Sequence, residues 1–95
     1  MYYIYILQSL KDRNFYTGFA EDLKRRFSEH QNGQVFSTKS RLPLKLIYYE
    51  AYLLKEDALN REKYLKTSMG KRVLKKQLLC FIIATKSDKI AIVSD

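Results

Sequence analysis

The sequence predicts an α/β (α+β) domain in which a small sheet of three strands is flanked by helices. Three observations support this prediction: an apolar, aromatic segment opens the chain, a polar turn follows it, and amphipathic helical patterns alternate with β-rich segments. The chain has 95 residues, enough for one modest hydrophobic core but not for two. Hydrophobic residues at 46% and charged residues at 29% are typical of a folded domain.

The strands are predicted from segments rich in β-branched and aromatic residues. Residues 2–8, YYIYILQ, are apolar on both alternating faces, which favours a central strand covered on both sides. The polar residues 11–14 form a turn, and residues 15–17 return as the second strand of a β-hairpin that ends at Gly18. Residues 44–52 are apolar and rich in β-forming side chains, so they are predicted to be the third strand.

The first helix is predicted over residues 22–31. At 100° per residue, one apolar stripe is formed by Ala20, Leu23 and Phe27. Arg25 lies on the opposite side, where it can pair with Glu29 at a spacing of four residues, so it is predicted to be a surface residue. Arg26 and His30 lie one turn apart at the margin of the apolar stripe, where they can face the sheet.

The second helix, predicted over residues 55–67, carries a carboxylate in an unusual position. Its apolar stripe is formed by Ala58, Leu59, Leu65 and Met69. Glu62 falls near the middle of this stripe, where a carboxylate costs several kcal/mol unless it is paired, protonated or bound to a metal. The position of Glu62 therefore requires an explanation.

The end of the chain is less regular. Gly70 is predicted to break the helical pattern, and residues 71–79 resume as a short third helix. Residues 80–95 contain two apolar runs around KSDK and are predicted to be a C-terminal extension, as a hairpin or a loosely attached tail. The predicted main domain is therefore residues 1–79.

The charge of the chain indicates a polyanionic partner. The net charge of +8 and the pI near 9.6 create a positive field that concentrates nucleic acid at the surface. Seven basic residues and one acidic residue lie between Arg61 and Lys76, and a flexible basic loop is predicted over residues 34–43. The predicted contacts to backbone phosphate are Lys39, Arg41, Lys66, Lys71, Arg72, Lys75 and Lys76. The alternative is a small basic domain that binds nothing specific.

Several other functional classes are excluded by composition. Cys80 is the single cysteine and His30 the single histidine, so neither an internal disulfide nor a tetrahedral zinc site can form from them. No apolar run approaches the roughly 20 residues of a membrane span, and no signal peptide opens the chain, so a cytoplasmic protein without membrane contact is expected. A Gly-rich phosphate loop, a nucleophile elbow and a glycosidase-type pair of carboxylates are absent from the sequence.

Five residues supply the types that phosphodiester hydrolysis requires: Tyr5, Tyr16, Arg26, His30 and Glu62. Such a reaction needs a water made basic, a cation beside the phosphate and usually a metal held by a carboxylate. Each residue also has a structural interpretation, because tyrosines and a lone histidine commonly pack in a small core. Glu62, in the same way, can be a buried ion-pair partner of Arg26. The residue types by themselves leave catalysis and packing open.

The order of these features resembles the GIY-YIG endonuclease family, and most closely its small stand-alone bacterial members. Tyr3-Ile4-Tyr5 corresponds to the first motif and Tyr16-Thr17-Gly18 to the second, and an arginine and a histidine follow in the next helix. The segment NREKYLKTSMGKR, which contains Glu62, also resembles the corresponding segment of family members. The resemblance extends from about residue 2 to residue 78.

The resemblance implies a fold and a reaction. The fold is an α/β sandwich with a three-stranded antiparallel sheet flanked by helices. The reaction is metal-dependent cleavage of DNA, with branched or damaged DNA as candidate substrates, and it uses one divalent cation, usually Mg²⁺. Because no separate DNA-binding domain accompanies the predicted domain, target choice is expected to come from this module or from a partner.

The resemblance also implies a role for each site residue. Glu62 corresponds to the glutamate that ligates the metal, and Arg26 to the arginine that contacts the scissile phosphate. Tyr5 is the candidate general base for the attacking water, and Tyr16 and His30 position water or phosphate. A tyrosine base requires a phenol pKa well below about 10, which the nearby Arg26 and the metal would favour.

The chain also departs from the family pattern at several positions. Tyr3 replaces the glycine of the first motif, Thr17 replaces the isoleucine of the second, and Gln8 stands where some repair nucleases of the family have a lysine. An alternative function is a non-catalytic DNA- or RNA-binding module that keeps the fold. A third hypothesis is an interaction domain that uses the apolar segment after Cys80.

Overall fold

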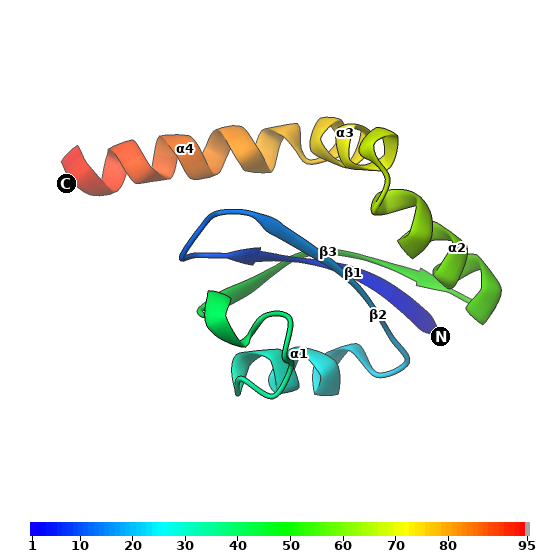
Figure 1. The fold of residues 1–95 in the computed structure, drawn as a ribbon. Helices are drawn as coiled ribbons and strands as arrows, with labels where there is room; N and C mark the ends of the chain where they lie inside the picture. Colours follow the sequence, from blue (N-terminus) through cyan, green and yellow to red (C-terminus); the bar gives the residue numbers. More distant parts are fainter. Residues whose placement is uncertain (95) are drawn as a thin grey trace. The chain divides into compact units, whose positions relative to one another are not determined.

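The structure is a computed structural model that describes the backbone of residues 1–94 and the side chains of residues 1–86. The chain divides into two compact units, Met1–Lys63 and Tyr64–Asp95. Its elements in chain order are β1 (Tyr2–Ser9), β2 (Phe15–Ala20), α1 (Leu23–Gln31), a 3-10 turn (Lys39–Arg41), β3 (Leu44–Tyr52), α2 (Lys55–Leu65), α3 (Ser68–Gln77) and α4 (Leu79–Ser94) (Figure 1). Among the described residues, no helix combines the length and the apolar character needed to cross a bilayer.

The three strands form one antiparallel sheet with β1 at its centre. The strand order is β2-β1-β3, and both neighbours of β1 run antiparallel to it. The four residues Ile4 to Leu7 are at most 1% exposed, although alternate side chains of a strand point to opposite faces of the sheet. The prediction of a central first strand is confirmed, and so is the predicted class, a three-stranded antiparallel sheet flanked by helices.

Gly18 lies inside β2 and does not end it, so the predicted strand boundary is wrong. The strand continues to Ala20, and Gly18 pairs across the ladder with Tyr5. A Cβ atom at Gly18 would lie 2.4 Å from both Cζ and Oη of Tyr5, closer than real Cβ contacts come. The glycine is therefore required because the Tyr5 ring crosses the neighbouring strand at this point.

Helix α1 covers one face of the sheet (Figure 1). It begins after Asp22, whose side chain accepts a hydrogen bond of 3.1 Å from the backbone N–H of Arg25 and caps the helix. Leu23 and Phe27 pack against the core on this face, as their periodicity predicted. The buried members of that core are Tyr5, Leu7, Ala20 and Leu44.

An ion pair attaches α2 to β3. Adjacent residues of a strand point to opposite faces, so Glu50 lies on the face opposite that of Tyr49, the partner of Tyr5 in the ladder. The Glu50 carboxylate accepts hydrogen bonds of 3.0 and 3.2 Å from Nε and Nη2 of Arg61, and a further bond from each of two tyrosine hydroxyls, those of Tyr48 and Tyr52. These bonds hold the turn of α2 that also carries Glu62.

The boundary between α2 and α3 differs from the prediction. Helix α2 ends at Leu65, and the side chain of Thr67 accepts a 3.0 Å hydrogen bond from Gly70 N–H and caps α3. Gly70 lies within α3 and does not break the helix. A Cβ atom at this position would lie 2.0 Å from the carbonyl oxygen of Tyr64. A glycine is needed at position 70 because the backbone at Tyr64 approaches closely, and not because the helix ends there.

One further expectation for the helices is wrong. Leu59 and Met69, assigned to the apolar stripe of the second helix, are 38% and 59% exposed, whereas Ala58 and Leu65 are fully buried as predicted. For residues 80–95 the sequence left a hairpin and a loosely attached tail open, and the described backbone there is helical, as part of α4 (Leu79–Ser94). Residue 95 lies outside the described residues, and the domain boundary at residue 79 remains a prediction.

The contact between Gly18 and Tyr5 predicts a specific double-mutant result. Gly18→Ala should destabilise the protein by about 1–3 kcal/mol, because the new methyl group overlaps the Tyr5 ring. In a Tyr5→Ala background the same substitution should cost less than about 0.5 kcal/mol, since the ring is gone. Urea denaturation of the four proteins measures both values. Equal costs in the two backgrounds would show that the ring contact does not constrain the strand.

Candidate functional site

A buried chain of hydrogen bonds links β1 to α1 and to the loop after α1. The Tyr5 hydroxyl lies 2.8 Å from Nε2 of His30, and Nδ1 of His30 lies 2.7 Å from the Thr38 hydroxyl. The Tyr16 ring completes the group, with its centroid 5.2 Å from that of His30 and 6.4 Å from that of Tyr5. The structure thus brings together Tyr5, Tyr16 and His30, three of the five residues predicted for the site.

His30 is fully buried, and its ring faces the Tyr5 hydroxyl of β1. Burial, together with the positive charge of Arg26, lowers the pKa of His30 to about 4, and Glu29 offsets only part of this effect. The imidazole is therefore neutral at pH 7. In a neutral imidazole one nitrogen donates and the other accepts, so His30 can bond both Tyr5 and Thr38 without carrying charge.

The pKa of the Tyr5 phenol is shifted in the direction opposite to the one expected from the sequence. Burial raises the pKa of Tyr5 to about 12, the Arg26 guanidinium lowers it, and the nearby Tyr16 and Glu62 raise it. For the protein by itself, the expectation of a phenol pKa well below 10 is therefore wrong. The phenol is neutral over the physiological range, and a role for Tyr5 in proton transfer needs a partner that takes its proton.

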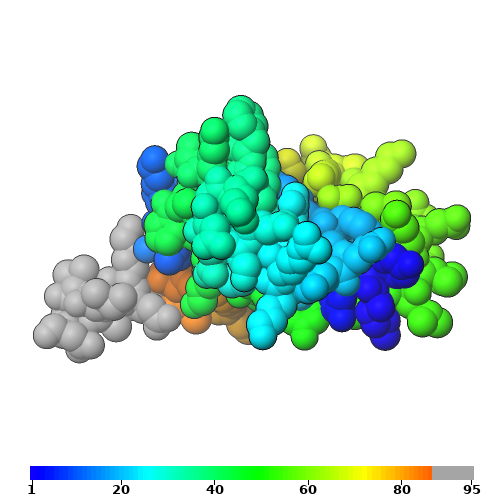
Figure 2. All heavy atoms as spheres, turned by 90° about the horizontal axis from the view of Figure 1, so that it is seen from below, coloured from blue at the N-terminus to red at the C-terminus, as the bar shows by residue number. Residues whose placement is uncertain are grey.

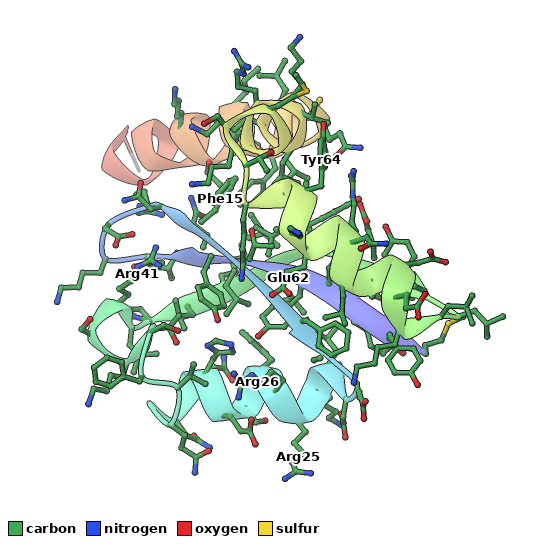
Figure 3. All side chains as sticks on the ribbon, turned by 45° about the vertical axis from the view of Figure 1, so that its right-hand side comes forward. Phe15, Arg25, Arg26, Arg41, Glu62 and Tyr64 are labelled. Atoms are coloured by element: carbon green, nitrogen blue, oxygen red, sulfur yellow. The ribbon has the colours of Figure 1, made fainter. Side chains whose placement is uncertain are left out.

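The two neighbouring arginines of α1 differ in exposure, as the sequence predicted. Arg25 points away from the sheet with 78% of its side chain exposed, and it pairs with Glu29 at 3.5 Å (Figure 3). Arg26 is 39% exposed and donates a hydrogen bond of 3.1 Å to the same carboxylate. It also lies close enough to Tyr5 and His30 to shift the pKa of both groups.

Glu62 is half-buried on α2 and acts electrostatically on Tyr5. Figure 3 places Arg26 on α1 and Glu62 on α2. No group of three or more His, Cys, Asp or Glu side chains that could enclose a metal exists among the described residues. Mg²⁺ commonly keeps several waters and binds through one or two carboxylates plus substrate phosphates. A single carboxylate such as Glu62 fits that kind of site and does not fit an all-protein cage.

A surface pocket lies elsewhere on α1. It has a volume of about 580 Å³ and is lined by Tyr3, Glu21, Asp22, Leu23, Lys24, Phe27, Leu46 and Tyr49. None of the predicted site residues lines it.

The basic residues predicted to contact phosphate are accessible. Arg41 is half-buried and pairs with Asp12 at 2.9 Å, which fixes the loop before β3 to the turn between β1 and β2. The other six are exposed on the surface: Lys39, Lys66, Lys71, Arg72, Lys75 and Lys76. Their contacts with nucleic acid remain predictions.

Three structurally important residues were missed by sequence reasoning. Thr38, fully buried against His30, lies in a loop where no periodicity marks inward-facing positions. Glu50 and Arg61 are 11 residues apart and pair only because α2 folds onto β3. For Arg61 a signal existed, since it directly precedes the unusual Glu62, but nothing local identified its partner.

Similarity to known proteins extends over most of this chain. A sequence model of the GIY-YIG catalytic domain matches residues 1–76, which include all five site residues. The chain belongs to the GIY-YIG family. Tyr5 and Tyr16, which the sequence resemblance assigned to the two family motifs, are the tyrosines whose rings lie against His30.

Curated GIY-YIG relatives of similar size carry the family name UPF0213. One from Staphylococcus saprophyticus is 43% identical over 75 residues, covering 78% of this chain and 90% of its own length. One from Limosilactobacillus reuteri is 48% identical over 68 residues, covering 68% of this chain and 70% of its own length. The solution NMR structure of a UPF0213 protein from Bacillus halodurans is 33% identical, covers 81% of this chain and 85% of that one, and has a TM-score of 0.51.

The lowered pKa of His30 predicts a loss of stability in mild acid. The unfolded chain binds a proton near pH 6.5 and the folded chain only near pH 4, so stability should fall as the pH drops between these values. The loss should reach up to about 3 kcal/mol, from about 1.4 kcal/mol per pKa unit. Urea denaturation at pH 7, 5.5 and 4 measures it. His30→Gln, which cannot titrate, should show a clearly shallower dependence; an equal slope in both proteins would contradict the assignment.

Proposed function

We propose that this protein is a divalent-metal-dependent endonuclease that hydrolyses DNA phosphodiester bonds, with branched or damaged DNA as candidate substrates. The observation that carries the proposal is the buried hydrogen bond between Tyr5 and His30, with Arg26 and Glu62 both in electrostatic range of the Tyr5 hydroxyl. A tyrosine with only a packing role would need neither the Arg26 guanidinium nor the Glu62 carboxylate near its hydroxyl. Membership of the GIY-YIG nuclease family supports the same reaction.

Arg26 is proposed to bind the scissile phosphate. Its guanidinium can donate several hydrogen bonds in a fixed plane, which matches phosphate oxygens. The hydrogen bond to Glu29 holds the side chain in place beside the sheet, at 3.1 Å. The guanidinium donors that bond neither Glu29 nor Tyr5 can then bind the phosphate, whose negative charge grows during the reaction.

The Tyr5–His30 pair is proposed to remove the proton of the attacking water. As the water proton moves to the Tyr5 oxygen, the Tyr5 proton moves to Nε2 of His30, which lies 2.8 Å away and has a free lone pair when the ring proton is on Nδ1. The water oxygen forms a bond to phosphorus, the bond from phosphorus to the leaving oxygen breaks, and solvent protonates that oxygen. A free phenolate is never required, which agrees with the raised pKa of Tyr5.

Glu62 is proposed to ligate one divalent cation, Mg²⁺ or a similar ion. When bound, such an ion would neutralise charge on the phosphate and on the leaving oxygen. Tyr16, packed against the His30 ring, is proposed to help position the water or the phosphate. Seven basic residues are proposed to contact the DNA backbone outside the reaction centre: Lys39, Arg41, Lys66, Lys71, Arg72, Lys75 and Lys76.

The proposed roles of Arg26 and Glu62 predict a matched comparison. With Mg²⁺, the wild-type protein should nick plasmid and branched DNA, and chelator should abolish the nicking. Arg26→Ala and Glu62→Gln should each lower the rate by about 100-fold or more. Arg25→Ala, which removes a neighbouring arginine that points to solvent, should leave the rate within about twofold, since exposed surface changes are usually mild.

The same experiment separates the competing functions. DNA binding without nicking in the wild-type protein would support a non-catalytic binding module and refute the nuclease. Equal losses in the Arg25 and Arg26 variants would show that charge, not position, is what matters. Circular dichroism of each variant establishes that the fold is unchanged.

The proton-transfer proposal predicts that Tyr5→Phe lowers the cleavage rate by about 100-fold or more, within the range for loss of a general base. The ring packing remains, but the buried Nε2 of His30 loses its hydrogen-bond partner, so stability should fall by about 1–3 kcal/mol and cleavage is measured well below the melting temperature of both variants. Tyr49→Phe is a suitable control, because Tyr49 is paired with Tyr5 in the sheet but is 54% exposed and has no role in the reaction. Full cleavage by Tyr5→Phe would exclude Tyr5 as the base.

A further inference from the structure

Phe36, in the loop after α1, is the most exposed large hydrophobic side chain among the described residues, at 84%. A single exposed apolar side chain is ordinary on a protein surface and by itself indicates little. Phe36 differs because its neighbours are fixed. Val35 before it is 8% exposed and Thr38 after it is fully buried, so the loop is anchored on both sides of the exposed ring.

The backbone of this loop is also held by hydrogen bonds. The amide groups of Thr38 and Lys39 donate to the carbonyl oxygen of Val35 at 3.1 and 2.9 Å, which closes a tight turn around Phe36. The amide of Gln34 donates to Glu29 at the end of α1. Figure 2 shows the segment that follows α1, in green, standing out from the surface beside the helix. The ring is therefore presented to solvent by an ordered turn.

A cation lies against the ring. Nζ of Lys39 is 4.8 Å from the centroid of Phe36, within the range of a cation–π contact. The loop 34–41, QVFSTKSR, contains two basic residues and no acidic one. An aromatic ring beside a lysine is the combination that proteins use on single-stranded nucleic acid, where the ring stacks on a base and the cation approaches the backbone.

This turn is connected directly to the proposed reaction centre. Thr38, two residues after Phe36, hydrogen-bonds His30, which bonds Tyr5. Two residues of chain span at most about 7 Å between Cα atoms. A strand whose phosphate lies at Tyr5 and Arg26 can therefore place a nucleotide at Phe36 within a few nucleotides of that phosphate.

We propose that Phe36 and Lys39 form a nucleotide contact in which the ring stacks on an unpaired base near the cleaved phosphate. Bases within an intact duplex already stack on one another, so this contact is made only where a base is unpaired or displaced. The preferred substrate class is therefore DNA with unpaired bases, such as bulges, gaps and flaps. The inference rests on the proposed function, because it assumes that the scissile phosphate lies at Tyr5 and Arg26.

A tryptophan at position 36 tests the contact directly. The chain contains no tryptophan, so Phe36→Trp introduces a single probe whose fluorescence can be excited apart from the tyrosines. The probes are a DNA duplex with a two-nucleotide bulge and a fully paired duplex of equal length, with chelator present to prevent cleavage. Stacking should quench the tryptophan strongly on the bulged duplex and little on the paired one. Equal quenching, or none while fluorescence anisotropy shows binding, would overturn the proposal.

Affinity provides the second measurement. Phe36→Ala should weaken binding to the bulged duplex by about 5- to 100-fold, the range for loss of one base–aromatic stack, and binding to the paired duplex by less than about twofold. Leu53→Ala, at another exposed hydrophobic position with 78% exposure, should change neither. Equal weakening on both DNAs, or no binding of either DNA by the wild-type protein, would refute the contact. Because binding is measured without cleavage, failure of the nuclease proposal would appear separately, as binding without nicking in Mg²⁺.

Discussion

The placement of the Tyr5 ring is the constraint on which the rest of the site depends. The ring crosses Gly18 of the neighbouring strand and brings its hydroxyl to 2.8 Å from His30. A slip of one residue between β1 and β2 would move the ring to the other face of the sheet. The strand register, the glycine and the position of α1 must therefore all be correct together. Because Thr38 bonds the far side of His30, the loop after α1 is tied to the same arrangement.

The interior of the site is made of neutral groups, and its charges lie at the edge. Burial moves the pKa of His30 down and that of Tyr5 up, so both are uncharged at neutral pH. Arg26 and Glu62 remain partly accessible to solvent. On the opposite face of the sheet, the Glu50–Arg61 ion pair attaches α2 to β3 and supports the turn that carries Glu62. Burial by itself would raise the pKa of Glu50, but hydrogen bonds from two tyrosines and Arg61 lower it, so the pair stays ionised.

Sequence patterns predicted the secondary structure correctly where a pattern had one structural interpretation, and incorrectly where it had two. The bounds of β3 followed from its β-rich composition and the start of α1 from its helical periodicity. Gly18 and Gly70 were both interpreted as breaks, whereas each permits a close approach within a strand or a helix. Leu59 and Met69 fitted an apolar stripe but are exposed, since periodicity describes a face and not what covers it.

The sequence by itself determined the fold class, the central position of the first strand and the five residues proposed for the site, because motif order and hydrophobic period are properties of the chain. The tertiary structure decided what those residues can do. The raised pKa of Tyr5 and the lowered pKa of His30 arise from burial, and Thr38 and Glu50 gain their roles from partners distant in the chain. The anchored presentation of Phe36 is likewise visible only once the turn is folded. Desolvation and long-range hydrogen bonds depend on which segments meet, and no local pattern records that.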